Sequence, residues 1–388
     1  MGECMPDRGQ RSQSGWHVRH PWSAIILVVA AFTLATDLLA GLLLIQDYDR
    51  YRTAHPVFHH GLLPGRSEKG RWAAREYDVF TNSLGFRDAK VREIDPQSSG
   101  KRLLLIGDSF TEGIGVPWEE SFAGILDSAL SKEGIEVLNA AAVSYSPKFY
   151  YAKTKYLLEE EKLRFGQLFV FIDNSDPMNE ITYEGFIPYR KISLRWLSLQ
   201  AGNFFYHHSY LYYSIKTLLN TSRENPLSLS WNRKMGAAAT DETSLESEEF
   251  IRATPLWSED AELFEKWGKR GLRLAAENME KLADLCTANH VKMTVVIYPW
   301  PHMIQNSELD NVQTFFWKDF CTKNNVGFVN LYPVFITGED PAAILNRYFI
   351  PGDVHWNSLG HRLVADRLLE SIDTMPGSPQ APEGSKPR

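Results

Sequence analysis

The stretch LLLIGDSFTEGIG, from Leu103 to Gly115, joins an apolar run directly to Gly-Asp-Ser, with another glycine at Gly113. An apolar run that ends in this way predicts a buried strand followed by a turn. The serine at the turn, Ser109, has two interpretations. It is either a small polar residue that the turn requires, or a nucleophile held at the end of a strand. The rest of the chain decides between them.

Five short apolar runs predict the strands of a buried sheet, and they lie at residues 102–106, 135–138, 167–172, 292–298 and 326–330. Helical patterns follow the first strand and precede the fourth. A last helix is predicted after Asn357, which is suited to cap it. Because strands alternate with helices, the sequence predicts an α/β fold whose parallel sheet is covered on both faces.

Residues 24–45, AIILVVAAFTLATDLLAGLLLI, are apolar and carry one charged side chain, that of Asp37. At about 1.5 Å per residue they would span roughly 33 Å, which is enough for the hydrocarbon core of a bilayer. No small-residue cleavage site follows, so we expect one uncleaved transmembrane anchor. Asp37 would be costly in mid-membrane, and is expected to be neutral or to face a partner helix.

Changes in composition indicate the other boundaries. We expect an N-terminal tail at 1–23, a connecting region at 46–100, a main domain at 101–373 and a disordered tail at 374–388. An insertion at about 177–260 separates the third and fourth strands. Its first part is rich in aromatic residues, which would stack on sugar rings, pack in a core or face a membrane. Its second part is polar and is predicted to be a mobile loop.

Composition excludes several classes of function. The net charge is -7 and the isoelectric point is about 5.9, so no basic field is available and nucleic acid is not an expected partner. Three cysteines are too few for a disulfide scaffold, and no Cys/His spacing typical of a metal site is present. We expect Cys286 and Cys321 to be buried thiols, or a disulfide if the domain is exported. No metal or organic cofactor is expected.

Ligands of an open parallel sheet bind outside the carboxyl ends of its strands, so the polar residues there are the candidates for chemistry. A serine becomes nucleophilic when a base takes its proton, and a carboxylate commonly orients that base. The chain offers Ser109, Asp353 and His355. In a loop, the spacing of Asp353 and His355 allows the carboxylate to reach Nδ1. Considered alone, however, His355 is more simply a solvated histidine and Asp353 a turn residue.

Two motifs together resemble a known family. GDSFTEG resembles the first block of the SGNH (GDSL-like) hydrolases, and DVHWNSLGH resembles their last block. The resemblance covers about residues 79–372. It implies a three-layer α/β/α sandwich with a five-stranded parallel sheet, and a triad of Ser109 as nucleophile, His355 as base and Asp353. The family usually has Asp-x-x-His, whereas this chain has Asp-x-His. This form is similar to the membrane-linked branch that acts on acetyl groups of exopolysaccharides, such as the alginate acetylation proteins.

The middle blocks depart from the family pattern. The second block usually supplies a glycine whose N–H binds the oxyanion, and Ala141 stands at that position when aligned on Asn139. The third block usually supplies an asparagine, where this chain has Ser175, preceded by Asn174. The resemblance implies an oxyanion hole made by the N–H groups of Ser109 and Ala141 with Asn174 or Ser175. The alternative is that Asn174 and Ser175 only cap the following segment.

Three functions remain open. The first is a serine esterase that removes acyl groups, expected to be acetyl, from a cell-surface or secreted glycan. The second is an O-acetyltransferase for an exopolysaccharide that uses the same triad, and the third is a non-catalytic glycan-binding module. A lipid ester also remains open as substrate. The expected protein is single-pass, with its main domain on the periplasmic side of the membrane. Its expected partners are an acylated glycan, the membrane and polysaccharide-assembly proteins.

Overall fold

The computed structural model describes residues 20–45, 48, 50–189, 193–221 and 248–373. The chain divides into two compact units. The smaller contains residues 1–47 and 200–224, and the larger contains 48–199 and 225–388. The predicted disordered tail and nearly all of the predicted mobile loop lie outside the described residues.

The larger unit is built on a sheet whose strand order is β10-β9-β8-β6-β7-β5-β4-β3. Its first five strands are parallel, as predicted, and each end lies within one residue of the expected position. They are β6 (Lys101–Ile106), β7 (Ile135–Asn139), β8 (Gln167–Ile172), β9 (Lys292–Ile297) and β10 (Gly327–Asn330). The prediction of an α/β fold is therefore confirmed.

The prediction of only five strands is wrong, because the described part of the sheet has eight. The region expected to be a connection supplies three antiparallel strands, β3 (Ser67–Trp72), β4 (Arg75–Thr81) and β5 (Arg87–Asp88). β5 joins the parallel strands through the pairing of Arg87 with Asn139. β3 and β4 are rich in charged residues and partly exposed, so they lack the apolar runs that marked the other strands. A separate hairpin pairs β1 (Arg52–His55) with β2 (His59–Leu62).

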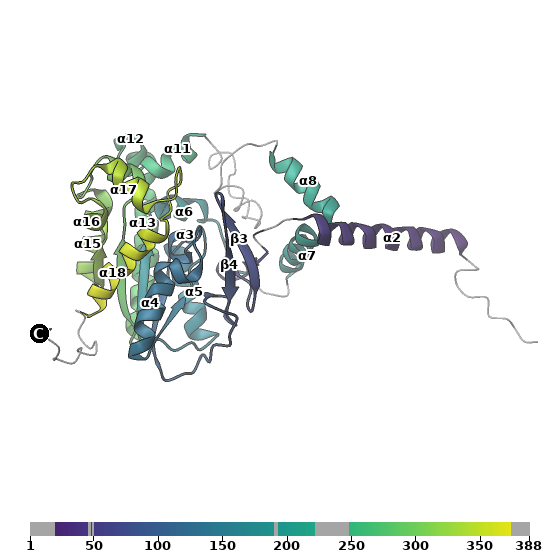
Figure 1. The fold of residues 1–388 in the computed structure, drawn as a ribbon, viewed down its shortest axis with the longest axis horizontal. Coiled ribbons are helices and arrows are strands. Elements are labelled where there is room, and N and C mark those ends of the chain that lie inside the picture. The colour runs from purple at the N-terminus through teal and green to yellow at the C-terminus, as the bar shows by residue number, and fades with distance from the viewer. Residues whose placement is uncertain (1–19, 46–47, 49, 190–192, 222–247, 374–388) are drawn as a thin grey trace, which may run out of the picture. The chain divides into compact units, whose positions relative to one another are not determined.

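Helices cover both faces of the parallel strands and give a three-layer α/β/α arrangement (Figure 1). The side chains of β6 alternate between two cores: Leu104 and Ile106 belong to one, and Leu103 and Leu105 to the other. The first core includes residues of α5 (Pro147–Glu159), α6 (Asp176–Thr182), α13 (Lys269–Ala288) and α15 (Val312–Asn324). The second includes residues of α4 (Phe122–Leu130), α17 (Pro341–Tyr348) and α18 (Ser358–Asp373).

Shorter helical segments lie mostly in the connections. Those that border the site described below are α3 (Ser109–Glu112) and α11 (Glu248–Leu256). The others are α12 (Ala261–Leu263), α14 (Pro301–Gln305), α16 (Tyr332–Phe335), the 3-10 turns Trp118–Glu120 and Ser131–Glu133, and a π-helical turn at Phe264–Gly268. Cys286 and Cys321 are buried free thiols.

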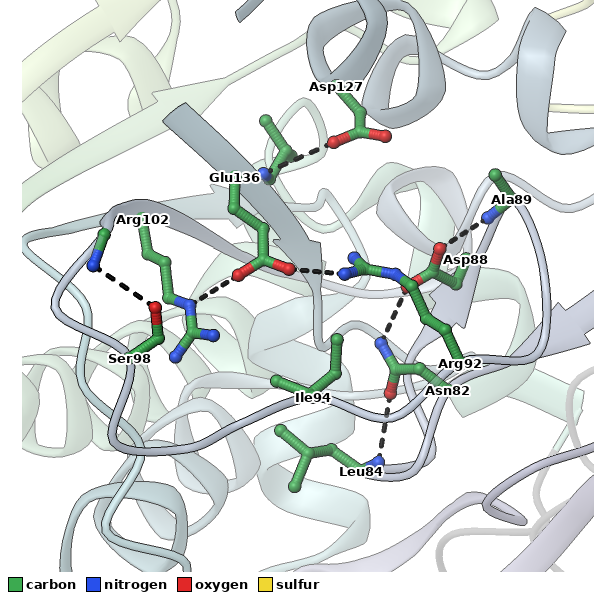
Figure 2. Close-up of polar contacts among 12 residues, drawn as sticks. Asn82, Leu84, Asp88, Ala89, Arg92, Ile94, Ser98, Arg102, Asp127 and Glu136 are labelled. Atoms are coloured by element: carbon green, nitrogen blue, oxygen red, sulfur yellow. Dashed lines mark hydrogen bonds and ion pairs between the residues drawn. The ribbon is translucent and has the colours of Figure 1, made fainter. Parts of the chain in front are cut away.

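A polar network joins the antiparallel extension to β7 and β6 (Figure 2). Glu136 of β7 accepts hydrogen bonds from Arg92, four residues after the end of β5, and from the almost fully buried Arg102 of β6, the latter at 2.6 Å. Arg92 also binds Asp88, whose carboxylate accepts a hydrogen bond from Asn82 at 2.9 Å. Burial alone would raise the pKa of Glu136, but the two arginines lower it below its ordinary value. The network therefore depends on an ionised Glu136.

The smaller unit contains α2 (Pro21–Leu44), α8 (Tyr210–Thr221) and the part of α7 (Leu194–His208) that begins at Gln200. α2 has 24 residues and a mean hydropathy of 2.3, so it is long and apolar enough to cross a membrane. It covers the predicted span at 24–45 apart from Ile45, which directly follows the helix. Within this unit, α8 packs against α2.

The network in Figure 2 predicts the effect of Glu136→Gln. This change leaves the buried Arg102 guanidinium without a carboxylate, so the free energy of unfolding should fall by about 1–3 kcal/mol. The measurement is urea unfolding of the detergent-solubilised chain, followed by tryptophan fluorescence. Because the pKa of Glu136 is lowered by folding, the difference from the parent is present at neutral pH and shrinks as the carboxylate is protonated in acid.

The matched control is Glu159→Gln, which breaks an exposed ion pair with Lys155 on α5. This pair is solvated on both sides, so its loss should change the free energy of unfolding by no more than about 0.5 kcal/mol. Equal effects of the two substitutions would contradict a stabilising role for the network.

Candidate active site

Ser109 lies at the carboxyl end of β6, where the chain turns sharply into α3. A Cβ atom at Gly107 would lie 2.2 Å from Thr111 Oγ1, so the turn requires glycine at this position. The carboxylate of Asp108 then caps α3 by accepting a hydrogen bond from the N–H of Phe110 at 3.0 Å. Ser109 is the first residue of the helix, so its N–H needs no partner inside the helix.

The structure brings Ser109, His355 and Asp353 together. Ser109 Oγ lies 2.8 Å from His355 Nε2, and His355 Nδ1 lies 2.5 Å from Asp353 Oδ1. The same carboxylate oxygen also accepts a hydrogen bond from the backbone N–H of His355 at 2.9 Å. The short Asp-x-His spacing is therefore accommodated by a tight loop in which one oxygen binds both the backbone and the ring of the histidine.

Trp72 supplies a fourth member of this hydrogen-bonded chain. Its indole Nε1 donates to Asp353 Oδ2 at 2.8 Å, and its ring meets the His355 ring edge-on, with the centroids 5.2 Å apart. Burial would raise the pKa of Asp353, but the hydrogen bonds from His355 and Trp72 and the charge of His355 lower it below its ordinary value. Trp72 could not be predicted from the sequence, because nothing in a charged edge strand marks a residue 281 positions away from its partner.

Asp108 also adjoins the serine, with Oδ2 3.4 Å from Ser109 Oγ. Burial and the nearby Asp173 raise the pKa of Asp108 well above its ordinary value, and Tyr298 donates to its other oxygen at 3.2 Å. These surroundings disfavour the charged form of Asp108, whereas His355 Nε2 lies 2.8 Å from Ser109 Oγ, so His355 is the better-placed base. Among the described residues, no group of His, Cys, Asp and Glu could hold a metal ion.

A cavity of about 340 Å³ opens beside the serine. Its walls are mostly apolar, with a few polar groups that come from the loops after the parallel strands and from α6 and α11. It is lined by Trp72, Asp108, Ser109, Phe110, Val143, Ser144, Ser175, Met178, Asn179, Thr182, Phe250, Ile251, Thr254, Pro255, Trp300, Gly352, Asp353, Val354 and His355.

The residues expected to form the oxyanion hole have different positions. Ser109 and Ser175 line the cavity, whereas Ala141 and Asn174 are not among its lining residues. The N–H of Ala141 donates to Asn139 Oδ1 at 3.2 Å. Asn174 is buried, and its side-chain Nδ2 donates to the carbonyl of Pro255 at 3.0 Å, so it fastens the end of α11 rather than facing the cavity.

Two polar residues that the sequence analysis did not single out line the cavity instead. Asn179 lies one helical turn after Ser175 on α6, and its Nδ2 donates to Ser175 Oγ at 3.2 Å. Ser144 follows β7 in the left-handed region, with φ of 61°. Helical spacing from Ser175 was a signal that could have found Asn179. The position of Ser144 depends on a strained backbone that the sequence does not display.

The loop that carries Ser144 is held by the buried ion pair between Arg52 and Glu112. Glu112, at the end of α3, accepts two hydrogen bonds from Arg52 of β1, at 2.6 and 2.7 Å, and a third from the N–H of Val143 at 2.9 Å. The guanidinium of Arg87 in β5 donates to the carbonyls of Glu112, Gly113 and Val116. The segments on both sides of the serine are therefore held by residues from the region before β6.

Comparisons with known proteins find similar solved structures but no matching family model and no matching curated protein. An acetylxylan esterase from Geobacillus stearothermophilus aligns with 72% of this chain and 98% of its own, at 13% identity and a TM-score of 0.39. A member of the lipolytic G-D-S-L family from Veillonella parvula aligns with 71% of this chain and 100% of its own, at 12% identity and a TM-score of 0.38. A psychrotrophic esterase from Pseudoalteromonas aligns with 70% of this chain and 96% of its own, at 12% identity and a TM-score of 0.36.

These solved structures include members of the family that the two sequence motifs resemble. Their identities are 13% or less and their TM-scores are 0.39 or less.

The contact with Asp353 predicts the effect of Trp72→Phe. A smaller aromatic ring remains and one N–H donor to Asp353 is lost, so the pKa of Asp353 should rise and its carboxylate should be protonated at a higher pH. The acid limb of the pH–rate profile for ester hydrolysis should therefore move to higher pH, with kcat reduced more than KM is changed.

Trp300→Phe is the matched control, because Trp300 lines the same cavity but donates to Asp173 at 2.8 Å. It should leave the acid limb in place. An unchanged limb in Trp72→Phe, or the same movement in both variants, would show that the bond to Asp353 does not orient the triad.

Proposed function

We propose that this protein is a serine esterase that cleaves small acyl esters, with acetyl groups of a glycan as the preferred substrate. The observation that carries the proposal is the continuous hydrogen-bonded chain from Ser109 through His355 to Asp353, at 2.8 and 2.5 Å, with Ser109 facing a cavity. Each residue has a partner of the kind that its role in acyl transfer requires.

The proposed reaction begins when His355 Nε2 takes the proton of Ser109 as Oγ attacks the ester carbonyl. The ester C–O bond then breaks, the alcohol leaves with the proton from His355, and the acyl group remains on Ser109. Water adds to this acyl-enzyme, again with His355 as base, and its attack releases the carboxylic acid and restores the serine. Asp353 stabilises the imidazolium that forms in both steps.

The oxyanion formed in each step needs donors beside Ser109. The N–H of Ser109 is one, because it is the first amide of α3. The groups that line the cavity near it, Asn179 Nδ2 and the backbone and hydroxyl of Ser144, are the other candidates. Ser175 acts through Asn179, whose amide it accepts, and through Asp173, to which its own hydroxyl donates.

The size and lining of the cavity favour a small acyl group as the part of the substrate that binds there. Its size suits a short acyl chain together with part of a leaving alcohol, and Trp72 and Trp300 offer flat apolar surfaces of the kind that stack on sugar rings. The glycan and the acetyl group are proposed from these surfaces and from the family that the motifs resemble. We further propose that α2 anchors the enzyme and that the larger unit works outside the cytoplasmic membrane.

An O-acetyltransferase is the second candidate, and the Asp353-Val354-His355-Trp356 form of the last motif favours it. The two activities share the acyl-enzyme and differ in the acceptor, which is water in the esterase and a sugar hydroxyl in the transferase. A binding module without chemistry would need neither the short Ser109–His355 contact nor the partly buried carboxylate of Asp353 behind it.

Ser109→Ala tests the nucleophile. Hydrolysis of p-nitrophenyl acetate by the full chain in detergent should fall by about 10⁴-fold or more in kcat, because the acyl-enzyme cannot form. Ser128→Ala, which removes an exposed serine on α4, should leave the rate unchanged. Parent-like hydrolysis by Ser109→Ala would contradict the proposal.

The same assay separates the two activities when short oligosaccharides are added. An esterase releases acetate whether or not sugar is present. A transferase gives an acetylated sugar, detected by mass spectrometry, and its turnover rises with sugar concentration.

Asn179→Ala tests the oxyanion donor. The loss of one such donor typically lowers kcat by about 10²-fold with little change in KM, because the donor acts mainly in the transition state. Thr182→Ala is the control: Thr182 lines the same cavity one turn further along α6, but its hydroxyl bonds the carbonyl of Met178. Equal, small effects on kcat would exclude Asn179 from the oxyanion hole.

A further inference from the structure

Asp37, the one charged side chain of α2, has a specific partner within the smaller unit. Its Oδ1 accepts a hydrogen bond at 2.8 Å from the backbone N–H of Leu211, in the first turn of α8. Ser209 Oγ accepts the N–H of Tyr212, the next residue, at 3.0 Å. The carboxylate therefore lies at the positive end of the α8 dipole and binds an N–H that has no partner inside the helix.

α2 also makes a close contact at Gly41, with the end of α7. A Cβ atom at this position would lie 1.8 Å from the carbonyl oxygen of His208, the last residue of α7. Gly41 is also the only buried residue of α2. A larger residue at this position would therefore force apart α2 and the corner between α7 and α8.

The position of this corner along α2 places it at a definite depth if α2 crosses a bilayer. With 24 residues at about 1.5 Å each, α2 is roughly 36 Å long, against a hydrocarbon core of roughly 30 Å. A centred helix would place Asp37 roughly 8 Å and Gly41 roughly 2 Å inside the hydrocarbon boundary at its C-terminal side. The N-terminus of α8 is bound to this stretch.

One exposed face of α8 is apolar. Leu211, Ile215 and Leu218 are spaced to share one face of the helix, and they are 62%, 49% and 71% exposed. The end of α7 adds Phe204 and Phe205, which are also exposed. Lys216 projects from another side of α8, a position from which a long cationic side chain can reach the headgroups.

We propose that the corner between α7 and α8, together with α8, is inserted in the leaflet that contains the C-terminal half of α2. With 12 residues, α8 is roughly 18 Å long, too short to cross the hydrocarbon core, so it lies within one leaflet. The occupant of its apolar face is lipid, because α8 packs against α2, whose own exposed side chains are also apolar.

The hydrogen bond between Asp37 and Leu211 supports lipid over water as the surroundings. Placing a carboxylate or an unpaired backbone N–H in hydrocarbon costs free energy. A hydrogen bond between the two groups lowers this free-energy cost for both. In water both would be solvated, and the pairing would contribute little. An acidic residue within an apolar span is thus explained by a helix that must begin inside the membrane.

The test uses the full chain in lipid nanodiscs with an environment-sensitive fluorophore at Ile215→Cys. Cys4 is first replaced by serine, while Cys286 and Cys321 remain, because burial raises the pKa of each thiol to about 12 and keeps it unreactive. The matched control carries the label at Lys155→Cys on α5 of the larger unit, where the side chain of Lys155 is 45% exposed. Each label is quenched by aqueous iodide and by lipids with a doxyl group near the headgroup.

We expect iodide quenching at position 215 to be weaker than at position 155 by about three-fold or more, with strong quenching by the doxyl lipid, as for an interfacial helix. Iodide quenching equal to that of the control, without doxyl quenching, would overturn the proposal. Release of the chain from membranes by alkaline carbonate would overturn it too, because α2 would then not be a span.

A second pair of variants tests the role of Asp37. Asp37→Asn keeps an oxygen that accepts the N–H of Leu211, so the label at position 215 should stay protected from iodide. Asp37→Leu removes the acceptor and should increase iodide quenching at 215 but not at 155. If Asp37→Leu left the protection unchanged, the hydrogen bond would not be what holds α8 in the leaflet.

Discussion

The hydrogen-bonded chain Trp72–Asp353–His355–Ser109 is the interaction on which the proposed chemistry depends. Its members come from an edge strand, the loop before the last helix and the turn after β6. The chain lowers the pKa of Asp353, which keeps a carboxylate behind the histidine. The neighbouring Asp108, in contrast, is buried beside another carboxyl and has a raised pKa. Two acids at one site, one beside the serine and one behind the histidine, thus have pKa values shifted in opposite directions by their surroundings.

Three residues from the region before β6 hold these hydrogen-bonded side chains and the neighbouring loops in place. Trp72 reaches Asp353, Arg87 binds the carbonyls that follow the serine helix, and Arg52 pairs with Glu112 below the loop of Ser144. The buried ion pair is satisfied by several hydrogen bonds, as a charge in a protein interior requires. The antiparallel extension is therefore part of the site, and the network of Figure 2 fastens it to the parallel strands.

The sequence predicted the parallel strands and the relation of Ser109 to His355, because apolar runs and the two motifs are local signals. The antiparallel strands escaped prediction because one of their sides is solvated, so REYDVFT has no apolar run. The predicted Ala141 and Asn174 are bound to Asn139 and Pro255, while Asn179 and Ser144 line the cavity. Such choices depend on which neighbour each polar group meets in three dimensions, and sequence spacing alone does not contain that information.

The most direct test of the account is to trap the acyl-enzyme. The full chain is mixed with p-nitrophenyl acetate, stopped in acid, digested and mapped by mass spectrometry. The account predicts one acetyl group on the peptide that contains Ser109 during turnover by the parent. This acetyl group should be absent in Ser109→Ala and nearly absent in His355→Ala, because His355 is the base that activates Ser109. Acetate release without any acetyl on Ser109, or acetyl on another residue that turns over at the rate of hydrolysis, would contradict it.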